Sequence, residues 1–208
     1  MMRNPLPLPT VLALALGGCS PAGAPDAEGP TDLLSETASP EDCLLLVWSS
    51  QEKPRAQFDR THDFVDGGAI SCATGTSASQ FDAAIAALRD AARSGNKRRM
   101  LAEIGLPLLY IDAAGNRREI EDRAEVEAVF DEIFDPAMIA LLQRLDLSQM
   151  SVAKDQGGFF TLGAVWLVVD RDGGRPRLVT VNRQALDEAL ATARDQAERN
   201  QGDRIPFD

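Results

Sequence analysis

The sequence predicts an α+β domain in which an antiparallel sheet packs on helices. Apolar residues recur at helical spacing between Ser77 and Gly95, and a strand–turn–strand pattern follows from Leu106 to Glu121. From Met150 onward the apolar period is that of extended strands. Hydrophobic residues make up 44% of the 208 residues, which is enough for the core of one domain of ordinary size.

The chain begins with a short apolar run, Val11–Leu16, behind the single charge of Arg3. Three prolines precede the run and Gly17-Gly18 end it. A membrane-spanning helix needs about 20 apolar residues, so this pattern favours a cleaved signal peptide over residues 1–18.

The residues Leu16-Gly17-Gly18-Cys19 resemble the lipobox of bacterial lipoproteins. The resemblance implies that the signal is cut before Cys19 and that Cys19 carries the lipid. Because Ser20 follows rather than Asp, it also implies the outer membrane, facing the periplasm. The alternative is an ordinary cleaved signal followed by an unrelated cysteine. Residues 19–41 are rich in Pro, Ala, Gly and Ser, so a lipid-anchored disordered tether is expected there.

Two further cysteines bracket the next segment, residues 42–76. Cys43 opens the apolar run Cys43–Ser50, and Cys72 lies in a second apolar stretch. The periplasm permits disulfides, so a Cys43–Cys72 bond is expected, and two free buried thiols are the alternative. The segment is predicted to be a β-like extension bracketed by this disulfide.

The main domain is predicted over residues 77–183 and begins with a helix. Ser77 and Gln80 form a capping-box pattern, and Gly95 is expected to end the helix. The apolar face of this helix comprises Phe81, Ala84, Ile85, Leu88 and Ala92.

A β-hairpin with its turn at Asp112–Asn116 is expected next. Asp122 then caps another helix, and Asp135-Pro136 restarts the helical pattern at once. The apolar faces of these two helices comprise Val126, Val129, Phe130, Ile133, Phe134, Met138, Ile139, Leu142 and Leu145.

Residues 157–182 are predicted to form two long strands around a turn at Asp172–Gly174. The first strand is apolar on both faces, which is typical of a strand in mid-sheet or under another layer. Either the Cys43 segment or a helix over residues 184–200 is expected to supply that layer, within a C-terminal helix and tail spanning 184–208. The even-numbered side chains Phe160, Leu162 and Trp166 are expected to face the helices and meet Phe130, Phe134 and Leu142.

The order helix, hairpin, helix, long strands resembles the nuclear transport factor 2-like (cystatin-like) fold. In that fold a bent antiparallel sheet wraps around helices and leaves a cone-shaped cavity. A closer likeness, over roughly residues 79–183, is to uncharacterised bacterial envelope proteins of this superfamily, through "VFDEIFDPAM", the Gly-rich strand ending in Trp166, and "LVTVN". Thr161 and Ala164 depart from the pattern, where those proteins carry Gly and Glu. The resemblance transfers no catalytic residue. The candidate pocket-lining residues are Tyr110, Phe130, Phe134, Phe160 and Trp166.

Several chemistries find no support in the residues. The formal net charge is −11, and the only basic cluster is Lys97-Arg98-Arg99, so nucleic acid is not an expected partner. One histidine, His62, is too few for a His-rich metal site. The Asp-rich turns lack the glycine and the last carboxylate of a calcium loop. No cofactor, metal or catalytic residue is therefore expected.

Three functions remain. The first expectation is a non-enzymatic envelope lipoprotein that binds a small apolar ligand or an envelope protein partner. The second is an inhibitor or immunity-type lipoprotein that blocks a periplasmic hydrolase, because acidic charge attracts cationic enzymes. The third is a pocket enzyme, isomerase- or dehydratase-like, with Tyr110 and Asp131 as donor and base. A mostly filled cone would favour the first two, and a polar pair in an open cavity would favour the third.

Overall fold

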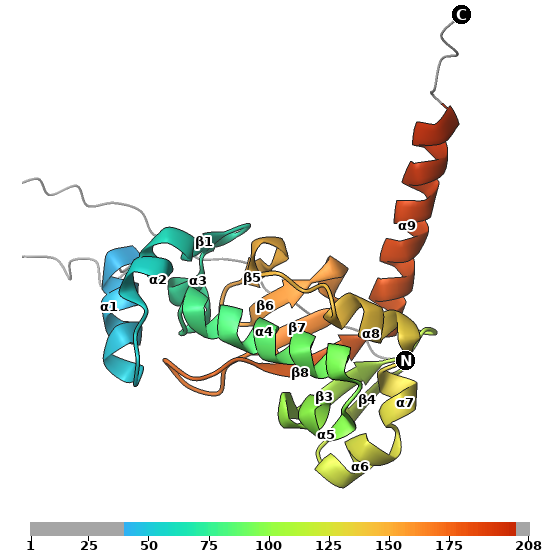
Figure 1. The fold of residues 1–208 in the computed structure, drawn as a ribbon, viewed down its shortest axis with the longest axis horizontal. Coiled ribbons are helices and arrows are strands. Elements are labelled where there is room, and N and C mark those ends of the chain that lie inside the picture. The colour runs from blue at the N-terminus through green and yellow to red at the C-terminus, as the bar shows by residue number, and fades with distance from the viewer. Residues whose placement is uncertain (1–39, 203–208) are drawn as a thin grey trace, which may run out of the picture. The chain divides into compact units, whose positions relative to one another are not determined.

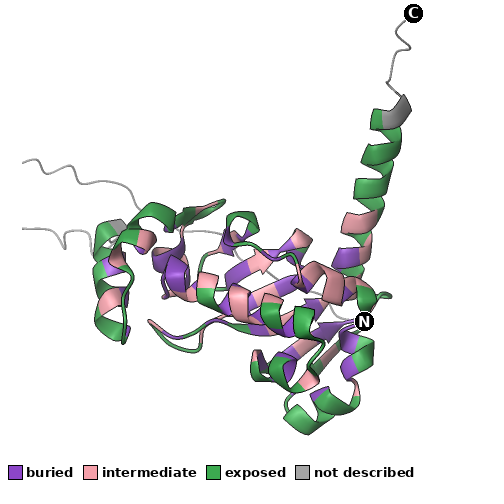
Figure 2. Ribbon diagram, viewed as in Figure 1, coloured by how far each residue is buried: buried purple, intermediate pink, exposed green. Residues whose placement is uncertain are grey.

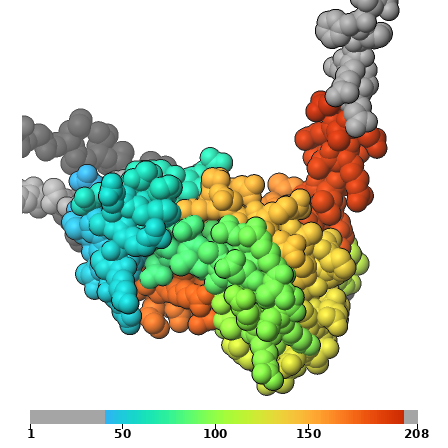
Figure 3. All heavy atoms as spheres, viewed as in Figure 1, coloured from blue at the N-terminus to red at the C-terminus, as the bar shows by residue number. Residues whose placement is uncertain are grey.

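The computed structural model of this chain describes residues 40–202, which adopt a mixed α+β fold (Figure 1). A six-stranded sheet has the order β4-β3-β8-β7-β6-β5, and β1 and β2 form a separate two-stranded sheet. Helices lie over one face of the six-stranded sheet (Figure 3). Within residues 40–202, no helix has the length and apolar character needed to cross a membrane.

The first half of the described chain is mainly helical and ends in a hairpin. Its elements are α1 (Pro40–Ser50), α2 (Ala56–His62), β1 (Phe64–Val65), β2 (Gly68–Ala69), α3 (Ile70–Thr74), α4 (Ala78–Ser94), α5 (Lys97–Ala102), β3 (Ile104–Ile111) and β4 (Arg117–Ile120).

The second half holds three short helices, four short strands and a long final helix. Its elements are α6 (Arg123–Ala128), α7 (Phe130–Ile133), α8 (Pro136–Leu142), the 3-10 turn η1 (Leu147–Gln149), β5 (Ser151–Ala153), β6 (Gly157–Phe160), the 3-10 turn η2 (Thr161–Gly163), β7 (Val165–Val168), β8 (Arg177–Asn182) and α9 (Arg183–Gly202).

The local signals for α4 and α8 are confirmed. The Ser77 side chain accepts a hydrogen bond from the backbone N–H of Gln80, and Gly95 follows α4 with a left-handed φ of 63°. Asp135 caps α8 by accepting from the N–H of Met138, with Pro136 in its first turn. The predicted hairpin is β3–β4, in which Leu108 pairs with Ile120 and Ile111 with Arg117.

The prediction of a wholly antiparallel sheet is wrong. β3 pairs in parallel with β8, the last strand, while the other pairings in the six-stranded sheet are antiparallel. The chain leaves the β3–β4 hairpin, forms α6 to α8, and then builds β5 to β8 as a meander. The final strand of this meander therefore joins the hairpin at mid-sheet.

The prediction of a β-like extension at residues 42–76 is also wrong, because the Cys43 segment is the helix α1 and Cys72 lies in the helix α3. Glu41 and Asp42 occupy the first turn of α1, where acidic side chains favour the helix dipole. A short continuous apolar run such as Cys43–Trp48 carries no period that separates strand from helix. The expected Cys43–Cys72 disulfide is present and joins α1 to α3.

The first of the two predicted long strands is broken. Thr161, Leu162 and Gly163 adopt φ values of 50°, 55° and 85°, and this left-handed turn folds the segment into the hairpin β6–β7. The break shifts the alternation of side chains by one residue. Phe160 pairs with Val165 and both are buried, whereas Trp166 pairs with Phe159 on the opposite face. The prediction that Trp166 and Leu162 face the helices is therefore wrong.

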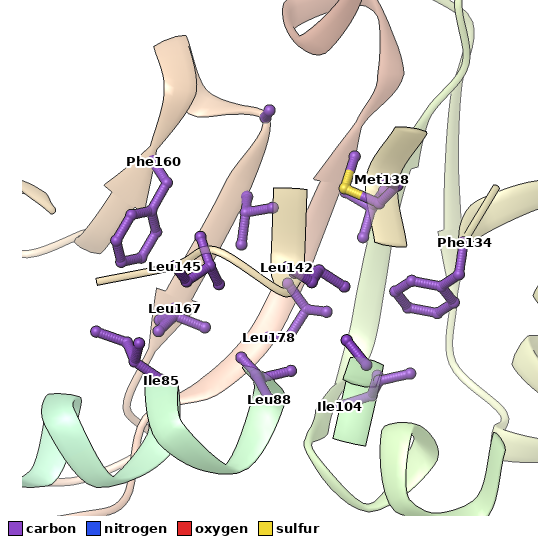
Figure 4. Close-up of a cluster of buried hydrophobic side chains, with 14 of the residues drawn as sticks. Ile85, Leu88, Ile104, Phe134, Met138, Leu142, Leu145, Phe160, Leu167 and Leu178 are labelled. Atoms are coloured by element: carbon purple, nitrogen blue, oxygen red, sulfur yellow. The ribbon is translucent and has the colours of Figure 1, made fainter. Parts of the chain in front are cut away.

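The core lies between the sheet and the helices (Figures 2 and 4). Ile85 and Leu88 of α4 point toward Phe160, Leu167 and Leu178 of the sheet, and Leu142 and Leu145 fill the space beside them. α4 and the α8 region thus form the layer that covers the sheet. The sequence predicts α9 or the Cys43 segment in this place, so that prediction is wrong. α9 contacts the rest of the fold through its first turns, and residues 191–200 are exposed (Figure 2).

Candidate functional site: a groove on the open face of the sheet

The sheet has a second face that the helices of residues 40–202 do not cover, which we call the open face. Side chains alternate between the two faces of a strand, and the register aligns one row across four strands. This row comprises Phe159, Trp166, Thr180 and Leu109, all half-buried. The Phe159 and Trp166 rings stack with their centroids 4.7 Å apart. The sheet therefore presents aromatic and aliphatic side chains on its open face.

Two irregularities in strand pairing lie at this face. One falls between the pairs Trp166↔Thr180 and Leu167↔Leu178 of β7 and β8, and the other is in β3. Between Ile104↔Leu178 and Leu109↔Thr180, β3 advances five residues while β8 advances two. The sequence explains why β3 leaves the ladder here, since Gly105 has no side chain to pack and Pro107, which follows a cis peptide bond, has no N–H to donate. A Cβ on Gly105 would lie 2.8 Å from a methyl carbon of Val179. The absence of that atom lets the two strands approach at the hollow.

The resulting groove has a volume of about 540 Å³ and a mainly apolar lining. Its lining comes from the start of β3, the first residue of α6, the end of β7, the loop after β7, and β8. The lining residues are Ile104, Gly105, Leu106, Pro107, Arg123, Val168, Val169, Asp170, Arg175, Arg177 and Val179. Leu106 is 40% exposed, so one wall of the groove is an apolar side chain in contact with solvent.

Three arginines of the groove meet at the C-terminal end of α5. Arg123 donates from Nη1 to the Leu101 carbonyl at 2.9 Å, and Arg177 donates from Nη1 to the Ala102 carbonyl at 2.8 Å. Arg175 forms an ion pair with the Glu103 carboxylate. The last carbonyls of a helix lack partners within the helix and attract cations, which explains the arrangement.

The arginines retain capacity for a ligand. A guanidinium has five N–H donors, and the contacts to α5 use only part of each set. Asp170 is the only carboxylate among the groove-lining residues, and Glu103 neutralises Arg175 alone. In a chain of net charge −11, this groove is thus a local concentration of positive charge beside apolar side chains. The arrangement can bind a molecule with an apolar body and a negative group.

A second hollow, which we call the disulfide hollow, lies between the C-terminal end of β7 and the helices α1 and α3. It has a volume of about 340 Å³ and is walled by α1, α3 and the turn before β6. Val168 and Val169 line both the groove and the disulfide hollow. Its full lining is Cys43, Leu46, Val47, Ser71, Cys72, Ala73, Thr74, Gly75, Asp155, Gln156, Gly157, Val168, Val169 and Asp172.

A buried polar cluster fastens this end of the molecule to α4. The Asp59 carboxylate accepts from the N–H of Ser79, at 2.8 Å, and from the indole Nε1 of Trp48, at 3.2 Å. The Asp63 carboxylate accepts from both the N–H and the hydroxyl of Ser71, each at 2.9 Å. Both carboxylates are fully buried. These bonds tie α1, α2 and α3 together and to the first turn of α4.

Burial raises the pKa of Asp63 above its usual value of 3.8, against the hydrogen bonds from Ser71, which lower it. Because the folded protein binds this proton more tightly than the unfolded chain, Asp63 favours folding at low pH. That contribution is lost as pH rises from 3.8 through the raised pKa.

We compare the free energies of unfolding of Asp63→Asn and wild type. We expect the difference to shift in favour of the variant as the pH rises from acid to neutral. The amide keeps an acceptor for the Ser71 N–H and places a donor near the Ser71 hydroxyl, without a buried charge. Urea unfolding of both proteins from about pH 3 to about pH 7 measures this difference in the free energy of unfolding. A difference that stays constant over this range would contradict the raised pKa.

The structure places four of the five candidate pocket-lining residues in the core. Phe160, Phe134 and Tyr110 are at most 5% exposed, and Phe130 is buried at the same cluster. These four side chains pack in the core between the sheet and the helices, and none of them lines the groove. Trp166 is separated from them and stands on the open face.

The suggested acid–base pair is not brought together. The Tyr110 hydroxyl donates to the backbone carbonyl of Glu132 at 3.3 Å, and burial, with the nearby Glu132 charge, raises the pKa of Tyr110. Asp131 is exposed on α7. His62 is exposed, and its Nδ1 lies 3.0 Å from the Phe58 carbonyl. Among residues 40–202, no three His, Cys, Asp or Glu side chains gather as a metal site would require. Cys19, the predicted lipid attachment residue, lies outside the described residues.

Sequence reasoning missed the groove and its arginines. One signal was available, since "IGLPLLYI" places Gly and Pro inside a strand pattern, which often marks a bulge. The arginines gave no signal, because Arg123 is separated from Arg175 and Arg177 by about 50 residues of chain. Comparison of the chain with protein-family models, with curated proteins and with solved structures found no match.

Proposed function

We propose that this chain is a non-enzymatic lipoprotein of the bacterial outer membrane that binds a small apolar ligand with a negative group in the groove. In this proposal residues 1–18 are a signal peptide, and the Cys19 lipid holds the domain at the periplasmic face of the membrane. One observation carries the binding function: Arg123, Arg175 and Arg177 line an apolar groove in an acidic protein.

The chemistry of the groove supports binding rather than catalysis. Its lining is aliphatic apart from the arginines and Asp170, so it offers an ion-pairing group but no thiol, hydroxyl or imidazole. The space between α4 and the sheet, where an enzyme of the resembled fold would hold substrate, is occupied by side chains such as Leu88, Phe160 and Leu167. This filled interior agrees with the first function expected from the sequence and disfavours a pocket enzyme.

The element order supports a nuclear transport factor 2-like fold as part of the proposal. A helix, a hairpin, further helices and a four-strand meander follow one another, and the helices lie on a single face of the sheet. The parallel β3–β8 pairing brings the hairpin beside the final strand. The groove lies on the face opposite to the helices, so the proposed binding site does not depend on an internal cone.

The binding function is tested by calorimetric titration with octanoate, octanol and octylamine, which share one alkyl chain and differ in charge. We expect octanoate to bind most tightly. Arg177→Gln should weaken octanoate binding by roughly fivefold to tenfold, as for loss of one partly exposed charge-assisted contact.

Arg194→Gln provides the matched control, because Arg194 lies in the exposed stretch 191–200 of α9 and is absent from the groove lining. It removes the same charge and should leave octanoate binding unchanged. Equal binding of the three compounds, or equal effects of the two substitutions, would contradict the proposed site.

The lipid anchor has its own test. Cells expressing the full chain are fed a clickable palmitate analogue, and Cys19→Ala is expected to abolish the label that wild type acquires. Each buried methylene contributes about 0.8 kcal/mol to anchoring, so the variant should also leave the membrane fraction. Equal labelling of the two proteins would overturn the lipoprotein assignment.

A further inference from the structure

The groove and the disulfide hollow share two lining residues, so a ligand that passes over both residues could occupy the two hollows as one elongated site. Val168 and Val169, at the end of β7, line both. From the start of β3 the apolar lining runs through Leu106 and Val179 to these valines, and then to Leu46 and Val47 of α1. We propose that this site takes a free long-chain aliphatic carboxylate, an inference that rests on the proposed binding function.

The distribution of charge sets the direction of the ligand. Arg123, Arg175 and Arg177 lie at the groove, so the carboxylate binds there. Asp155 and Asp172 line the disulfide hollow, and their carboxylates would repel a ligand carboxylate placed there. The alkyl chain therefore extends away from the arginines, over Val168 and Val169, and ends against α1.

The surface of α1 supports a chain that reaches this far. Leu46 is 59% exposed and lines the hollow, so an alkyl chain in the hollow would cover its aliphatic side chain. Cys43, one turn earlier on α1, is bonded to Cys72 of α3, and both half-cystines line the hollow. The disulfide thus holds α1 in place as the end wall.

The experiment measures binding of hexanoate, octanoate, dodecanoate and hexadecanoate to the full chain, below their micelle concentrations. For wild type we expect the dissociation constant to fall with each added methylene beyond octanoate, by up to about fourfold per methylene if it is fully buried. Leu46→Asp should weaken hexadecanoate binding by about tenfold or more and leave octanoate binding unchanged.

The control is Leu45→Asp, which places the same charge on the neighbouring residue of α1. Leu45 is 58% exposed and does not line the hollow, so this variant should bind every compound as wild type does. Both leucines are exposed, so both variants are expected to fold, as circular dichroism would verify. If Leu46→Asp melts at a lower temperature than Leu45→Asp, Leu46→Ser takes its place.

The outcomes separate this inference from the proposed function. If octanoate and hexadecanoate bind wild type equally, the groove binds anions but no chain enters the disulfide hollow, and the inference is overturned alone. Equal weakening by the two leucine substitutions also overturns it. If no carboxylate of any length binds, the proposed function fails as well. Binding of an apolar peptide with a free C-terminal carboxylate, without binding of hexadecanoate, would assign the site to another ligand class.

Discussion

Phe160→Ala is expected to lower the free energy of unfolding by about 3–5 kcal/mol, the usual cost of truncating a buried aromatic side chain. Phe160 is 1% exposed and lies under α4, where Ile85 and Leu145 point toward it (Figure 4). The cavity left by the substitution would be closed on one side by the sheet and on the other by a helix. Neither can collapse into it without moving the other contacts of the core.

Trp166→Ala is expected to cost less, about 1–2 kcal/mol, although tryptophan is the larger residue. It loses one stacking contact, with Phe159, and a half-buried surface on the open face. Urea unfolding followed by circular dichroism compares the two variants without relying on the tryptophan signal. If Trp166→Ala proves as destabilising as Phe160→Ala, another chain or segment covers the open face, and the groove is not free.

Replacing both Cys43 and Cys72 by serine is expected to lower the free energy of unfolding by about 3–4 kcal/mol. The bond closes a loop with a sequence separation of 29, and the chain-entropy model gives about this value for a loop of that length. The serines would also weaken the packing of α1 against α3. We therefore expect the double variant to lose the first turns of α1 before the core unfolds.

Wild type unfolded in the presence of a thiol reductant is the matched comparison, because it lacks the bond and keeps both cysteines. The double variant and the reduced protein should agree within about 1 kcal/mol. A loss of less than about 1 kcal/mol in both would show that the buried bonds of Asp59 and Asp63, rather than the disulfide, hold α1 to α3 in place.

The helix boundaries were predictable because the interactions that set them act within a few residues. Ser77 caps α4 through the N–H of Gln80, three residues away, and Asp135 does the same for α8. Gly95 ends α4 because it adopts a left-handed φ without steric cost. The disulfide pairing was predictable for a different reason, since only two cysteines remain after Cys19.

The break in the predicted long strand could not be read from the sequence. Gly163 gave one weak signal, but Thr161 and Leu162 also adopt positive φ, which non-glycine residues rarely do alone. The buried pair Phe160–Val165 and the contacts of η2 with α9 hold them there. Since side chains alternate with a period of two, one extra turn moved Trp166 from the expected core to the open face.

By itself, the sequence determined the α+β class, the caps of α4 and α8, the β3–β4 hairpin and the disulfide, because short-range hydrogen bonds, φ preferences and residue counts decide them. Only the tertiary structure decided the parallel β3–β8 pairing, the helical state of the Cys43 segment and the groove. Gly105, Val168 and Val179 line one hollow, and Arg123 and Arg177 meet at α5, only because strands distant in sequence pair as they do. Such contacts depend on how a whole sheet packs against its helices, and no local pattern records them.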